Sequence, residues 1–137
     1  MKRVIFVLFL GGAVLWGSVC PIREGGAATL LSREKASEVV SLRGVEVKGG
    51  EVSGELVNQS QRLVRDVQLL IRYTWLWKNE FRPGQDDPGM AVYYTVERSI
   101  PPGQSVRFTY KPSSPLPSRP DGTYETTVSV AGFTEVY

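Results

Sequence analysis

The chain has 137 residues, the size of a single domain, and its 16 Lys and Arg nearly balance its 14 Asp and Glu. It contains no His, which excludes nucleophiles activated by a His base and zinc sites with His ligands, and its single Cys excludes an intrachain disulfide. Hydrophobic residues make up 42% and charged residues 22%, a balance typical of a folded globular chain rather than a disordered one.

Residues 1–28 have the layout of a secretory signal peptide. Lys2 and Arg3 form a positive start, residues 4–16 form an apolar run, and small residues follow. We therefore expect export to the periplasm or the extracellular space. Removing residues 1–28 takes three of the 16 cationic and one of the 14 anionic side chains, which leaves 13 of each. A neutral domain argues against binding to nucleic acid, which needs a basic surface.

Three ways of processing this segment stay open. The first is cleavage after Ala28, because Gly26 and Ala28 supply small residues at the two positions that a signal peptidase reads. The second is lipidation of Cys20, although the residues before it depart from the usual lipoprotein pattern. The third is an uncleaved anchor, because residues 4–22 carry no charge and approach the length that spans a bilayer. Contact with a membrane is expected only through such a lipidated or uncleaved N-terminus.

The pattern of the chain changes near residue 39. Residues 29–38 are polar and mixed, and they read as a linker or a short helix. Apolar residues then recur at every second position, which is the period of a half-buried strand. One strand is expected around residues 45–47 and the next over 52–56. Between them, residues 48–50 (KGG) predict a tight turn, because Gly readily adopts a positive φ.

The most regular strand signal covers residues 63–78. One face of this stretch carries six apolar side chains at alternate positions: Val67, Leu69, Ile71, Tyr73, Trp75 and Trp77. The other face is mostly polar, so the pattern predicts a long strand with one buried side. A helix would distribute these residues around its axis.

The remainder of the chain alternates between strands and loops. Two long loops are indicated by their Pro and Gly content, at residues 79–89 and 112–122, and residues 100–104 (IPPGQ) predict a tight turn. Three further strands are expected, at 92–96, 106–110 and 124–130, the last with an extension toward residue 137. The fold predicted for residues 39–137 is an all-β, antiparallel Ig-like sandwich of about six to seven strands.

Three segments carry a resemblance to a known family. They are residues 52–60 (VSGELVNQS), residues 73–78 (YTWLWK) and residues 100–108 (IPPGQSVRF). In this order they resemble the FxLYD-type domains, which are exported Ig-like sandwiches of the bacterial envelope. The resemblance extends over about residues 45–130. It implies a periplasmic or cell-surface accessory domain with no catalytic residues.

Aromatic residues are the strongest candidates for a binding surface, because they combine apolar area with few rotatable bonds. Phe81 lies in the long loop 79–89, and Tyr93 lies on the opposite face of its strand from its neighbour Tyr94. Trp75 and Trp77 have two interpretations, as the end of the core or as side chains that face a ligand.

Acidic residues offer weaker candidates. Asp86 and Asp87 share the 79–89 loop with Glu80, and the alternatives there are a solvated loop, a partner-binding loop or a calcium site, although the spacing departs from the known calcium-loop pattern. Glu97, Asp121 and Glu125 could in principle serve glycoside hydrolysis, but no cleft signature accompanies them. The arginines between core positions are explained by a solvated sheet face or, alternatively, by an anionic envelope partner.

These observations predict a non-catalytic exported protein of the cell envelope with no cofactor and no bound metal. The first hypothesis is a module for protein interaction or assembly, with another envelope protein as its partner. The second is a module that binds a small ligand or glycan through aromatic residues of the loop and rim. An open edge strand would favour the first hypothesis, because such edges accept further strands, and a deep aromatic cleft would favour the second.

Overall fold

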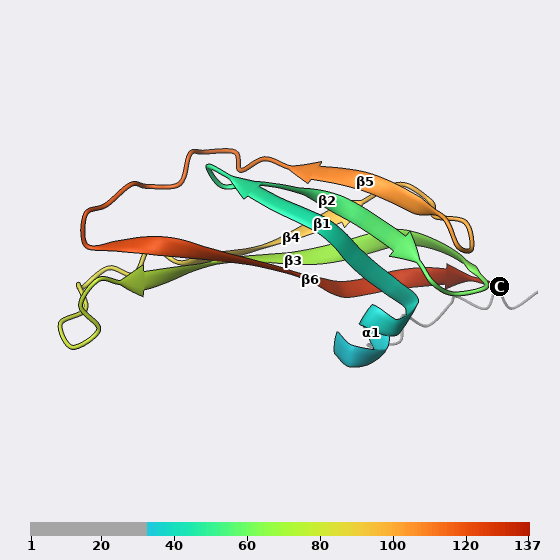
Figure 1. Cartoon of the computed structure of the whole chain (residues 1–137), viewed down its shortest axis with the longest axis horizontal. Helices are drawn as coiled ribbons and strands as arrows, with labels where there is room; N and C mark the ends of the chain where they lie inside the picture. The colour runs from blue at the N-terminus through green and yellow to red at the C-terminus, as the bar shows by residue number, and fades with distance from the viewer. Residues whose placement is uncertain (1–32) are drawn as a thin grey trace, which may run out of the picture.

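The computed structural model describes residues 33–137, which form a sandwich of two three-stranded antiparallel sheets (Figure 1). One sheet has the order β1-β2-β5 and the other the order β4-β3-β6. The predicted signal peptide, residues 1–28, and Cys20 within it lie outside the described residues. Within the described residues, no helix is both long and apolar enough to cross a membrane. In chain order the elements are α1 (Arg33–Val39), β1 (Val40–Lys48), β2 (Glu51–Asn58), β3 (Leu63–Trp77), β4 (Met90–Val96), β5 (Ser105–Tyr110) and β6 (Gly122–Val136).

β3 is the central strand of its sheet and supplies much of the core. Its side chains alternate as the sequence predicts: Leu69 and Ile71 are fully buried, whereas Arg72 is exposed. Trp75 continues the buried face, with only 5% of its surface exposed. The facing sheet adds the buried residues Val40, Val52, Leu56 and Phe108. The antiparallel β-sandwich predicted from the alternation is therefore confirmed, with six strands.

The segment before the sandwich contains a short helix. For the described part of residues 29–38, the structure has the helix of the two alternatives, and this helix begins at Arg33 and packs against β1 and β6. Its Ala36 is 1% exposed and belongs to the core. Helix α1 therefore takes part in the packing of the sandwich.

β1 departs from simple alternation at a bulge. Its register against β2 shifts between Arg43 and Glu46, and Gly44 within the bulge has a φ of 56°. A left-handed residue in a bulge is commonly Gly, since other residues are strained there. Beyond the bulge, Val47 lies opposite the buried Val52, yet 42% of its surface is exposed. The predicted strand is present, but its second half is poorly covered.

The tight turn predicted at Gly49 and Gly50 joins β1 to β2. Both glycines have positive φ, 58° and 88°, which suits a two-residue hairpin. The Gly50 carbonyl accepts a hydrogen bond of 2.6 Å from the buried Tyr73 hydroxyl, so a side chain of β3 ties its sheet to the hairpin of the other sheet. Burial, with a smaller contribution from Tyr110, raises the pKa of Tyr73 above its ordinary value.

We expect Tyr73→Phe to lower the free energy of unfolding by about 1 kcal/mol, because it leaves the Gly50 carbonyl without its partner. Since folded Tyr73 holds its proton to a higher pH than the unfolded chain, stability is complete below the ordinary pKa of 10.0 and falls as the pH rises above it. The variant should lose less stability than the wild type over that alkaline range. Urea melts at several pH values measure both effects. If the free energy of unfolding fell equally at alkaline pH in the wild type and in Tyr73→Phe, the raised pKa would not belong to Tyr73.

The buried amide of Asn58 joins the β2–β3 turn to the turn before β5. Its Nδ2 donates to the carbonyls of Arg62 (2.7 Å) and Ile100 (2.8 Å). Its Oδ1 accepts from the backbone N–H and the hydroxyl of Ser60, at 2.9 and 2.7 Å. The backbone of Asn58 also pairs with Gly103 and Gln104. Two of the segments that carry the FxLYD resemblance, 52–60 and 100–108, are thus held together by one side chain.

Candidate functional site

An aromatic cluster occupies the end of the sandwich where β3 finishes and β6 begins. Trp75 meets Trp77 edge-on, with ring centroids 6.1 Å apart, and it meets Tyr124 with centroids 4.8 Å apart. Trp75 is buried and Trp77 is half-buried. The core interpretation therefore holds for Trp75, while Trp77 lies at the margin of the core.

Arg119 links the loop 112–122 to the loop 79–89 at this end of the sandwich. Its guanidinium donates two hydrogen bonds to the carboxylate of Asp121, and its Nη1 donates to the backbone carbonyl of Asp86 at 2.9 Å. The bonded carboxylate raises the pKa of Arg119. The same guanidinium lies 5.5 and 5.4 Å from the ring centroids of Trp75 and Trp77. Sequence reasoning missed this residue, because a single Arg in a Pro-rich loop has no period that would reveal its partners.

The acidic residues of the 79–89 loop do not converge on a site. Asp86 contributes its backbone carbonyl to Arg119, as described above. The Asp87 carboxylate accepts a hydrogen bond of 2.8 Å from the Gly89 N–H, which closes a local turn. Among residues 33–137, no group of three or more His, Cys, Asp or Glu is placed to hold a metal ion.

The two predicted aromatic residues, Phe81 and Tyr93, lie on separate surfaces. Phe81 is 97% exposed in the loop, and its N–H donates to the side chain of Asn79. Tyr93 is 63% exposed on the outer face of its sheet, opposite Leu70. Leu70 is seven residues along β3 from Trp77, where the loop begins, so roughly 23 Å of strand separates the two regions. The structure therefore does not bring Phe81 and Tyr93 into one surface.

The outer faces of the two sheets differ in character. On the β1-β2-β5 sheet, Arg43 lies opposite Glu55, which in turn lies opposite Arg107. This alternation of charge is typical of a solvated face. On the β4-β3-β6 sheet, Tyr93 and Leu76 are exposed, the latter by 45%.

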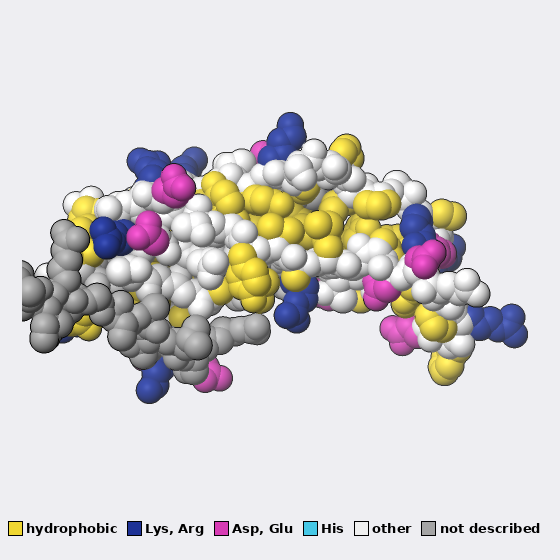
Figure 2. Space-filling model, turned by 180° about the vertical axis from the view of Figure 1, so that it is seen from behind, with side chains coloured by type: hydrophobic (Ala, Val, Ile, Leu, Met, Phe, Trp, Pro, Cys, Tyr) yellow, Lys and Arg dark blue, Asp and Glu magenta, His cyan; other side chains and the backbone are white. Residues whose placement is uncertain are grey.

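One open side of the sandwich carries apolar surface. Viewed from behind, apolar side chains gather along the middle of the molecule (Figure 2). The edge strands β4 and β5 contribute half-buried residues to the core, among them Tyr94 and Tyr110, whose ring centroids are 5.3 Å apart. These rings pack against each other across the two sheets on this side.

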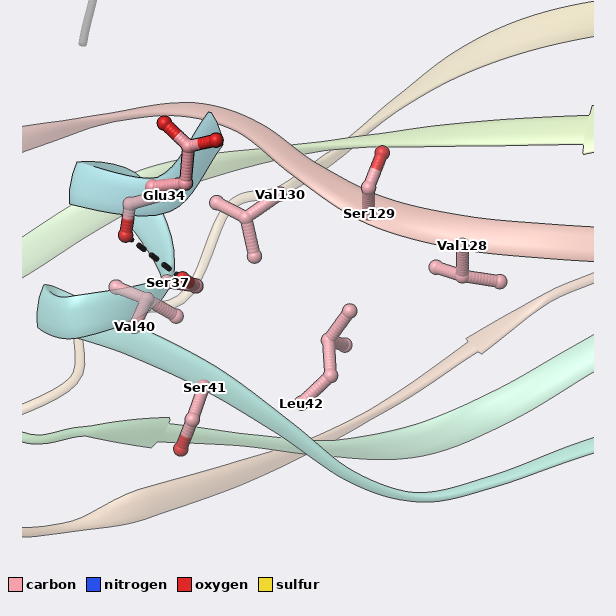
Figure 3. Close-up of a pocket in the computed structure, with 8 residues that line it drawn as sticks. All are labelled: Glu34, Ser37, Val40, Ser41, Leu42, Val128, Ser129 and Val130. Carbon is pink, nitrogen blue, oxygen red and sulfur yellow. Dashed lines mark hydrogen bonds between the residues drawn. The ribbon is translucent and has the colours of Figure 1, made fainter. Parts of the chain in front are cut away.

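On the opposite side, a groove lies between β1 and β6 (Figure 3). Its volume is about 450 Å³, and α1 contributes Glu34 and Ser37 to one end. Its apolar lining comes from both sheets and consists of Val40, Leu42, Val128 and Val130. We call this feature the β1–β6 groove. It was not predicted, because the sequence shows which residues alternate but not which strands form the edges.

β6 borders this groove with an unpaired edge. It pairs with β3 on one side, and no described strand pairs with it on the other. Over its 15 residues β6 contains no Lys, Arg or Pro, whereas proteins commonly protect exposed edges with such residues. The register of β6 against β3 is irregular beside Gly132, but over residues 122–130 it is regular and this part carries one charge. Among the other edge strands, β1 has a bulge and several charges, and β4 and β5 are only seven and six residues long.

Comparisons of the chain with protein-family models, curated proteins and solved structures find no match. The segments that carry the FxLYD resemblance fall on β2, the end of β3, and the turn and strand at β5. The contacts of Asn58 give two of them, residues 52–60 and 100–108, a structural role. Function must therefore be argued from the surfaces of the sandwich.

Proposed function

We propose that this protein is a non-catalytic interaction or assembly module of the cell envelope, and that it binds an extended segment of a partner protein along β6. The observation that carries the proposal is the unpaired edge of β6 beside the β1–β6 groove. The resemblance to FxLYD-type Ig-like domains supports the same class of function, since it implies an exported accessory domain.

The backbone of β6 supplies the affinity in this mode of binding. An added strand would pair with its free N–H and C=O groups, and such pairing depends little on the partner's sequence. The groove supplies selectivity. Alternate side chains of an added strand point into the groove, where Leu42 of the facing sheet and Val128 of β6 offer apolar contacts. The preferred partner segment is therefore extended, with apolar residues at every second position.

The test compares two Leu→Thr variants of the full chain. Leu42 is half-buried and lines the groove, whereas Leu76 is exposed on the outer face of the other sheet. Tagged protein from cells expressing each variant is used to capture partners from envelope extract, and circular dichroism confirms that both variants are folded. We expect Leu42→Thr to reduce capture of a specific partner at least about fivefold. Leu76→Thr should leave it unchanged.

Two results would contradict the proposal. Equal capture by both variants would exclude the β1–β6 groove as the binding surface. Capture that survives Leu42→Thr but is lost in Phe81→Ala or Tyr93→Ala would move the interaction to the 79–89 loop or to the outer face of the β4-β3-β6 sheet. Asp86 and Asp87 belong to the same loop and would then be examined with Phe81.

One observation favours ligand or glycan binding as a second candidate function. A hollow of about 310 Å³ at the end of the sandwich is lined by Trp75, Tyr124 and Arg119 among others. The buried Nε1 of Trp75 has no hydrogen-bond partner among the described residues. Aromatic faces beside hydrogen-bonding groups suit a sugar ring. A shift in tryptophan fluorescence on titration with neutral and acidic oligosaccharides would support this candidate, and an unchanged spectrum would exclude it for the sugars tested.

We also propose that the protein is exported, on the basis of the signal-peptide layout of residues 1–28. The intact mass of the protein recovered for the capture experiment distinguishes cleavage after Ala28 from lipidation of Cys20 and from an uncleaved anchor. If the protein were cytosolic and still carried Met1, it would not be exported and could not act in the cell envelope.

A further inference from the structure

We infer that β6 pairs with β6 of a second copy of this chain, in an antiparallel arrangement centred on Thr126, so that two sandwiches share one continuous sheet. The inference rests on the proposed function and names the partner of the open edge. It depends on three properties of β6: the part of the edge that is free, the side chains that would face each other, and the groove beside them.

The free part of the edge is the first half of β6. Helix α1 packs against β6 and lies beside the later part of the strand (Figure 1). Where α1 reaches the groove, the side chains of Val128 and Val130 point into the groove and not along the backbone edge (Figure 3). This leaves residues 122–130 open for pairing. A strand that pairs with its own copy about a two-fold axis is centred on the middle of the paired stretch. The middle of residues 122–130 is Thr126.

This register places no like charges opposite each other. Thr126 faces Thr126 of the second copy, and Thr–Thr pairs across strands are favourable. The only charged residue in the paired stretch, Glu125, faces Thr127 of the second copy. No two like charges are opposed, so nothing in the side chains resists the pairing.

The apolar residues of the two copies also match. β6 directs Val128 and Tyr124 toward the facing sheet, since they lie opposite the buried residues Ile71 and Trp75 of β3. In the centred register, Val128 of one copy lies beside Tyr124 of the other. The apolar lining of the β1–β6 groove therefore continues onto the second copy.

The test uses sedimentation equilibrium of protein recovered from cells expressing the full chain. Thr127→Glu places a new carboxylate opposite Glu125 of the second copy, twice per dimer. Within one copy, Thr127 is exposed and lies opposite Arg72, so this change should not harm the fold. We expect dimer dissociation to become about two- to thirtyfold easier. Thr127→Lys should tighten the dimer, because it creates two opposite-charge pairs.

The matched control is Thr95→Glu, which makes the same change at an exposed, outward-facing position of β4, the other edge strand of the same sheet. It should leave dimerisation unchanged.

A wild-type protein that stays monomeric at every concentration, or an equal effect of Thr95→Glu and Thr127→Glu, would overturn the inference. Protection from hydrogen exchange, under monomeric conditions, of those β6 amides that do not pair with β3 would also overturn it, since another segment would then occupy the edge. Loss of partner capture in Leu42→Thr from a monomeric protein would leave the proposed function standing without this inference.

Discussion

We expect Ile71→Asp to unfold the protein, with a loss of more than about 4 kcal/mol, because it buries a carboxylate that has no partner. Ile71 is fully buried in the middle of β3, between Val92 of β4 and Val128 of β6. The same substitution one residue further along is the control. Arg72 is exposed, so Arg72→Asp should change the free energy of unfolding by only about 0.5 kcal/mol.

Urea melts of the two variants measure this difference. Small and equal losses would mean that the register of β3 is wrong, since a shift of one residue exchanges its two faces. The comparison therefore tests the position of the whole strand as well as the burial of one side chain.

The second large effect is expected for Asn58→Asp, at about 3 to 5 kcal/mol. The substitution removes both Nδ2–H donors and places a negative oxygen against the carbonyls of Arg62 and Ile100. Because Asn58 is fully buried, water cannot compensate either loss. The β2–β3 turn should then separate from the turn before β5.

Asn79→Asp is a matched control for this substitution. Asn79 is exposed, and its Oδ1 accepts one hydrogen bond from the Phe81 N–H, which a carboxylate also accepts. Thermal melts should therefore show a much lower melting temperature for Asn58→Asp and a nearly unchanged one for Asn79→Asp. Similar melting temperatures for the two variants would show that the Asn58 amide does not hold these turns together.

Local sequence patterns predicted the features that depend on neighbouring residues. The alternation of β3 fixes its buried face because the side-chain period of a strand is two. The hairpin at Gly49 and Gly50 follows from the conformational freedom of Gly. Helix α1 stayed ambiguous because it is short and its one core residue, Ala36, gives no apolar stripe.

The candidate sites depended instead on contacts between distant residues. The β1–β6 groove forms because β1 and β6 are edge strands of facing sheets, and the order of strands in a sheet is not encoded in any single strand. Likewise, Arg119 reaches the Trp75 ring and the Asp86 carbonyl only because the two long loops meet at the same end of the sandwich. The bulge at Gly44 also depends on residues outside its own strand, since a bulge exists only relative to the partner strand, here β2.

The pairing of β3 with β6 has a consequence for the order of events during synthesis. β3 is complete at Trp77, but the strand that covers its other edge begins at Gly122, after β4, β5 and both long loops have been made. A chain that is still growing through these loops therefore holds one backbone edge of β3 without its main pairing partner. Such long-range closure is slow, so the nascent chain should remain a substrate for chaperones until β6 has emerged from the ribosome.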